Sequence, residues 1–92
     1  MTPMLIASER GESHIIRLLV DSGADKDGSA EYGETPIYIA SRHGRLDAVR
    51  LLIEAGADID RETYTGRTPC SVAEEWGHSE IARLLKDARN RN

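Results

Sequence analysis

The amino-acid sequence repeats itself with a period of 33 residues, and the copies align without a gap. Thr2-Pro3 returns as Thr35-Pro36 and as Thr68-Pro69, and seven positions are identical in all three copies. One unit of this length cannot bury its own apolar residues, so neighbouring copies must stack on one another. The period therefore predicts one stacked domain over residues 1–92, divided into repeats 1–34, 35–67 and 68–92.

Signals within one copy predict two helices and an extended loop. Thr35 is a candidate helix N-cap, and Pro36 fits the first helical turn, where its missing N–H costs nothing. Gly44 stands where the first helix must end and the chain reverse. A second helix is expected from about residue 46 to residue 55, and Gly56 suits its C-terminus. The polar residues 57–67 predict a turn-rich hairpin that leads to the next Thr-Pro.

The three helix starts read TPMLIA, TPIYIA and TPCSVA, and the copies share a mid-repeat glycine and a Leu-Leu pair. With the 33-residue period, these motifs resemble the ankyrin repeat over essentially the whole chain. The resemblance implies an all-α solenoid of stacked helix-turn-helix units, with β-hairpin loops projecting to one side. It also implies a role in protein recognition.

Two departures from the family pattern bear on packing. The His of the usual TPLH start is replaced by Leu5, Tyr38 and Ser71, so the hydrogen bonds that it makes between hairpins are absent or rebuilt; we expect Tyr38 to pack between the loops. Lys26 occupies a position that is usually a buried aliphatic residue, as Ile59 is one repeat later. The first loop should therefore pack less well than the second.

Composition excludes several classes of function. The net charge is −4, and residues 1–34 hold seven acidic and three basic residues, so no basic stripe for nucleic acid exists. No apolar run is long enough for a membrane span, and no export signal precedes the first repeat. The single cysteine, Cys70, rules out an internal disulfide, which favours a reducing compartment, the cytoplasm or the nucleus.

No constellation of residues predicts an enzyme, a metal site or a cofactor. Cys70 aligns with Met4 and Ile37, which predicts a small core residue rather than a nucleophile. The three histidines occupy different places in their repeats, and His78, which follows Gly77, is expected to make a structural hydrogen bond.

A recurring arginine at one position of each second helix is the other regular feature. Arg50 and its equivalents Arg17 and Arg83 have acids three residues before or four residues after, which predicts exposed ion pairs on an outer face.

Residues that differ between copies at the hairpins and first-helix ends are the better candidates for binding, since the family contacts its partners there. Tyr and Trp most often dominate interface energetics. The predicted partner-binding residues are Tyr32, Glu34, Arg42, His43, Tyr64, Arg67, Glu75 and Trp76.

Two functions remain open at this stage. The first is a protein-interaction module that binds a partner protein or peptide through a concave face of hairpin tips and first helices. The alternative is a structural module that packs within a larger multi-repeat or multidomain protein and has no free partner. The apolar first copy, with Ile6, Ile15 and Ile16, has the composition of an interior repeat. We therefore expect a fragment of a longer array, or weak self-association through the first repeat.

Overall fold

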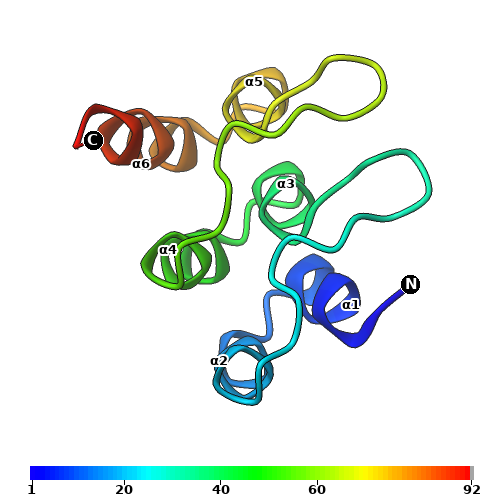
Figure 1. Cartoon of the computed structure of the whole chain (residues 1–92). Coiled ribbons are helices and arrows are strands. Elements are labelled where there is room, and N and C mark those ends of the chain that lie inside the picture. The colour runs from blue at the N-terminus through cyan, green and yellow to red at the C-terminus, as the bar shows by residue number, and fades with distance from the viewer. Residues whose placement is uncertain (92) are drawn as a thin grey trace.

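A computed structural model describes residues 1–91; Asn92, the last residue of the third predicted repeat, lies outside the described residues. Residues 1–91 form six helices, two in each repeat. They are α1 (Pro3–Arg10), α2 (Ser13–Asp21), α3 (Pro36–Arg42), α4 (Leu46–Glu54), α5 (Pro69–Glu75) and α6 (Ser79–Asn90). The first helices α1, α3 and α5 stack in one row and the second helices α2, α4 and α6 in another (Figure 1). The stacking expected from the period and the all-α solenoid implied by the family resemblance are both confirmed.

The Thr-Pro pairs begin the first helix of every repeat, as predicted. Each threonine is an extended N-cap residue whose side-chain oxygen accepts a hydrogen bond from a backbone N–H three residues later, at 3.3 Å for Thr35 and Tyr38. The cap satisfies a backbone donor that the helix itself leaves unpaired. In the third repeat the Thr68 N–H also donates a hydrogen bond to Ser71 Oγ at 2.9 Å, and the two reciprocal bonds form a capping box.

Gly44 makes the reversal between α3 and α4 with φ of +73°, a left-handed conformation that glycine adopts without a steric penalty. Its equivalents Gly11 and Gly77 have φ of +72° and +77°. The second helix then begins at Leu46 and ends at Glu54, one residue before the predicted end.

The main core lies between the two rows of helices. Its buried residues come from all three repeats and include Ile16, Ile37, Val49, Leu52 and Ile81. A second apolar cluster lies beneath the loops, where Tyr38 packs with Leu5, Ile39 and Val72. Tyr38 is therefore the packing residue that its position predicted.

The loops project on the far side of the first helices, but no β-strand forms among residues 1–91. The expected hairpins are reduced to two backbone hydrogen bonds each. The Ala30 and Thr63 N–H groups donate to the Glu34 and Arg67 carbonyl oxygens at 2.8 Å, and the Gly33 and Gly66 N–H groups donate back to the Ala30 and Thr63 carbonyl oxygens at 3.0 and 2.9 Å. The pairing goes no further because Thr35-Pro36 and Thr68-Pro69, directly after the loops, begin the next helices, and proline has no N–H to donate.

Where the chain reverses between the two helices of a repeat, two equivalent residues connect successive repeats. Arg45 Nε donates to the carbonyl oxygen of Glu9 at 2.9 Å, and His78 Nε2 lies 3.1 Å from the carbonyl oxygen of Arg42. Both acceptors lie near the end of the preceding first helix. His78 therefore makes the structural hydrogen bond expected from the sequence.

The first loop packs less tightly than the second, as expected from a lysine at position 26 where the next repeat has Ile59. Ala24 is exposed, whereas its equivalent Ala57 is buried. Lys26 is half-buried beside Gly56, and Ile59 packs against the core. None of the helices found in residues 1–91 combines the length and apolar character that crossing a membrane requires.

Candidate functional site

Two loops and the first helices make up the face on which the candidate residues lie. The loops at residues 30–34 and 63–67 project to the same side, away from α2, α4 and α6 (Figure 1). We refer to the two loops together with the C-terminal ends of α1, α3 and α5 as the loop face. All eight residues predicted from the sequence lie in the two loops, at the last residue of α3 or α5, or at the residue directly after one of these helices.

Three aromatic side chains of the loop face are open to solvent. Tyr32 is 64% exposed, Tyr64 is 77% exposed and Trp76 is 58% exposed. Large apolar rings on a folded surface are costly to hydrate and gain the most from burial against a partner. This exposure is what the choice of these residues as a binding surface requires.

Tyr64 also connects the two loops. Its backbone N–H donates to the carbonyl oxygen of Tyr32 at 3.0 Å. A Cβ atom added at Gly33 would lie 2.8 Å from the Tyr64 Cδ1 atom, so the ring rests directly on the glycine backbone. Tyr64 thus has a packing role that its place in a loop did not indicate, and it fixes the first loop relative to the second.

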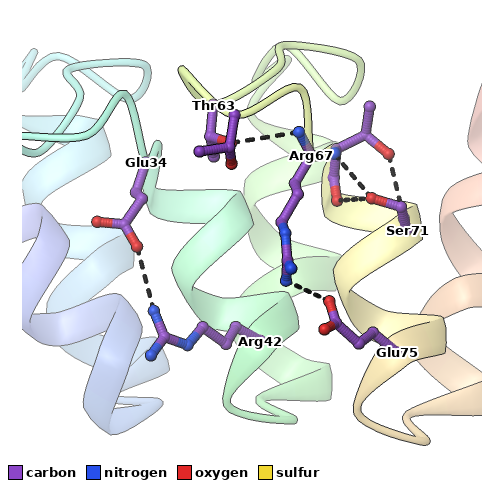
Figure 2. A network of polar contacts seen from close by, with 8 residues as sticks. Glu34, Arg42, Thr63, Arg67, Ser71 and Glu75 are labelled. Atoms are coloured by element: carbon purple, nitrogen blue, oxygen red, sulfur yellow. Dashed lines mark hydrogen bonds and ion pairs between the residues drawn. The ribbon is translucent and has the colours of Figure 1, made fainter.

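The charged candidates pair with one another instead of standing free. Glu34 and Arg42 form an ion pair of 3.1 Å between the end of the first loop and the end of α3. Arg67 and Glu75 form the corresponding pair one repeat later (Figure 2). Positions 34 and 67 are equivalent, as are 42 and 75, so the two repeats carry the same pair with the charges exchanged.

A small network stabilises the base of the second loop. The Arg67 N–H donates to Thr63 Oγ1 at 3.2 Å, and Thr63 Oγ1 lies 3.1 Å from Thr65 Oγ1 (Figure 2). These contacts fix the backbone of the second loop where Arg67 begins. The ion pair between Arg67 and Glu75 therefore joins two ordered segments, the second loop and α5.

The remaining candidates stand at the ends of the first helices. His43 Nε2 lies 3.7 Å from a carboxylate oxygen of Glu9 in the neighbouring repeat. Trp76 follows α5 as its C-terminal cap, with its ring exposed. The helix ends and loops thus bring together two internally paired sets of charges and three open rings.

Residues that the sequence set aside from function lie where the repeat predicted. Cys70 is buried, and burial followed by the nearby Glu74 carboxylate raises the pKa of its thiol. Arg50 lies on the outer face and reaches Asp47 at 4.0 Å. Among residues 1–91 this is the only ion pair formed by the recurring arginines, so the predicted pairs four residues on are wrong. The side chains of Arg17 and Arg83 are exposed to solvent instead.

The sequence reasoning missed the structural role of Arg45, which connects the first two repeats through its bond to the Glu9 carbonyl oxygen. The available signal was its equivalence to His78: each follows the mid-repeat glycine and each can donate from a ring or guanidinium nitrogen. The part of the chain that the structure describes holds no group of three or more metal-ligating side chains.

Comparison with known proteins supports the assignment of the fold. A family model described as ankyrin repeats, in three copies, matches residues 1–63 of the chain. No curated protein matches the chain. The matched segment contains the first repeat, the second helix pair and four of the eight candidate residues, Tyr32, Glu34, Arg42 and His43.

Proposed function

Because the chain belongs to the ankyrin-repeat family, whose repeats are generally protein-protein interaction modules, we propose that it binds a partner protein or peptide through the loop face. The observation that carries the proposal is the exposure of Tyr32, Tyr64 and Trp76 on that one face. Members of the family are typically non-enzymatic, and the chain's own function is then recognition rather than catalysis.

The ordering of the loops favours binding by a preformed surface. Tyr64 rests on Gly33, and each loop is held to a first helix by an ion pair, Glu34 with Arg42 or Arg67 with Glu75. A surface that is already ordered loses less conformational entropy when a partner binds. The ring of Tyr32, which is 64% exposed, is then the part that adapts to the partner.

The aromatic and charged residues have different roles in this proposal. Burying one ring at an interface contributes about 2 kcal/mol or more in alanine scanning, on the order of thirtyfold in affinity. Exposed charges instead alter mostly the association rate and its salt dependence. Because Glu34 is already paired with Arg42, and Arg67 with Glu75, we assign these four charges to orienting the loops and setting specificity, and the rings to affinity.

The test compares proteins retained by the immobilised chain and by matched variants. Proteins that the wild type retains, and that Tyr32→Ala loses, are candidates for the specific partner. With such a protein purified, calorimetry should give a Kd raised about thirtyfold for Tyr32→Ala. Arg50→Ala, on the outer face, is the control and should bind like the wild type. If Arg50→Ala abolishes binding while Tyr32→Ala binds normally, the partner lies on the opposite face and the proposal is wrong.

The alternative, a structural module without a free partner, is favoured by one observation, the packing of the Tyr64 ring on Gly33. If the loop aromatics serve packing alone, Tyr64→Ala lowers the unfolding midpoint substantially and no protein is retained by the wild type. With 77% of Tyr64 exposed, we expect only a small loss of stability.

A further inference from the structure

The first repeat ends in an apolar surface, which we term the leading face. Ile6 of α1 and Ile15 and Leu18 of α2 are 36%, 41% and 51% exposed. These are the exposed large aliphatic side chains of the helices, apart from the aromatic residues of the loop face. Adjacent aliphatic side chains in solvent indicate a surface that gains free energy when covered.

Comparison between the copies shows which way this surface faces. Ile39 and Val72, the equivalents of Ile6, are 6% and 1% exposed, and Ala48 and Ile81, the equivalents of Ile15, are 1% and 2% exposed. A position that is buried in the second and third copies and exposed in the first faces the preceding copy. The leading face is therefore built to receive a pair of packed helices.

We propose that the leading face of one chain binds the leading face of a second copy, in a symmetric pair related by a two-fold axis. A closed contact of this kind uses the same patch on both copies, so each apolar side chain meets an apolar surface. The other end of the array decides between this arrangement and an open chain of copies.

The opposite end of the array is polar and does not match. Ser71 is exposed at the position where Leu5 and Tyr38 are buried under the following repeat. Beside it, Glu74 is paired with Lys86 at 3.0 Å. A head-to-tail contact would place Ile15 and Leu18 against these charges and remove them from water, which is unfavourable. Symmetric pairing avoids that cost.

The charges along α2 fit the symmetric arrangement. His14 and Arg17 precede Leu18, and Asp21 follows it. When two copies of α2 cross in opposite directions near Leu18, the Arg17 side chain of each copy approaches Asp21 of the other. Exposed charges of this kind contribute little affinity, but they favour this direction of pairing over the parallel one.

The pairing would leave the loop face open in both copies. The loops project to the side of the array, whereas the leading face is at its end (Figure 1). A pair would therefore present two loop faces at once, and a partner with two binding sites would be held by both. This linkage raises the apparent affinity without any new contact at either site.

Sedimentation equilibrium tests the proposal at chain concentrations from about 1 µM to about 1 mM, the range in which weak pairs dissociate. We expect the average mass to rise from the monomer value of 10.2 kDa towards twice that value, and no further. Leu18→Glu should raise the dissociation constant more than about tenfold, because the symmetry places the charge on both sides of the contact. Arg83→Glu, an exposed charge change on α6, is the matched control and should pair like the wild type.

Chemical crosslinking tests the symmetry separately. In a Cys70→Ser background, Leu18→Cys should be joined to a second copy by a short bismaleimide, and Arg83→Cys should not. A chain that stays monomeric throughout the range, a Leu18→Glu variant that still pairs, or a mass that rises beyond two copies would each overturn the proposal. Loss of pairing in Arg83→Glu would also overturn it, because the contact would then involve the polar end.

Discussion

The contact of His78 with Gly44 can be tested with two glycines that share a backbone conformation. Gly44 and Gly77 have φ of +73° and +77° and end the first helix of their repeats. A Cβ atom at Gly44 would lie 2.7 Å from the His78 Cε1 atom, whereas a Cβ atom at Gly77 would meet nothing within 4 Å. Gly44→Ala and Gly77→Ala therefore pay the same cost for placing an alanine in the left-handed region, but only Gly44→Ala makes the new methyl group clash with the His78 ring.

The size of the difference follows from what the clash displaces. An alanine in the left-handed region costs about 1–2 kcal/mol at either position. At Gly44 the methyl group must also move the His78 ring off its bond to the Arg42 carbonyl oxygen. A hydrogen bond of this kind contributes about 0.5–1.5 kcal/mol, and the ring loses its packing on the glycine backbone as well. Gly44→Ala should be less stable than Gly77→Ala by about 1–2 kcal/mol.

Urea denaturation followed by far-UV circular dichroism measures this difference, provided that each variant unfolds in one transition. A cycle with His78→Ala isolates the contact: once the ring is absent, the added methyl group at Gly44 should cost no more than it costs at Gly77. Equal stabilities for Gly44→Ala and Gly77→Ala, with strictly additive effects in the cycle, would refute the contact between the repeats.

Three further predictions follow from the structure. Lys26→Ile, which copies Ile59, should raise the free energy of unfolding by about 1 kcal/mol through added apolar burial, and an unchanged urea midpoint would contradict it. Glu34→Arg and Arg42→Glu should each cost roughly 0.5 kcal/mol, while the double variant, which reproduces the charge order of the third repeat, should return to within about 0.3 kcal/mol of the wild type in the same assay. Because burial raises the pKa of the Cys70 thiol above its ordinary value in the folded chain, the stability due to the protonated thiol is present below that ordinary value and is lost as the pH rises through the folded pKa. Unfolding midpoints of Cys70→Ala should therefore fall less between pH 7 and about pH 10 than those of the wild type.

The helices and the core could be read from the sequence because they depend on signals within one period. Thr35 and Pro36 begin a helix, Gly44 ends it, and Cys70 is buried because its equivalents are apolar. Each of these features is decided by local backbone chemistry or by position in the repeat. The structure moved only the end of the second helix, by one residue, to Glu54.

Contacts between repeats could not be read in the same way, since they depend on how the copies are offset in space. The outer arginines were expected to pair along their own helices, but Arg42 and Arg67 are the arginines that pair closely within the loop face. The exchanged charges at positions 34 and 67 were visible one period apart and could have indicated those pairs. Nothing in the sequence signals that the Tyr64 ring rests on Gly33, because that contact requires the two loops to be placed side by side.

Hydrogen exchange of the chain, measured alone and with a purified partner, tests the central claim most directly. If the loop face is the binding surface, protection should increase at residues 30–34 and 63–67 and at the C-terminal ends of α3 and α5. Exchange in the exposed parts of α2 and α4 should stay as it is in the free chain. Protection confined to α2, α4 and α6, with both loops exchanging as before, would contradict the account, since the partner would then lie on the face that carries Arg50.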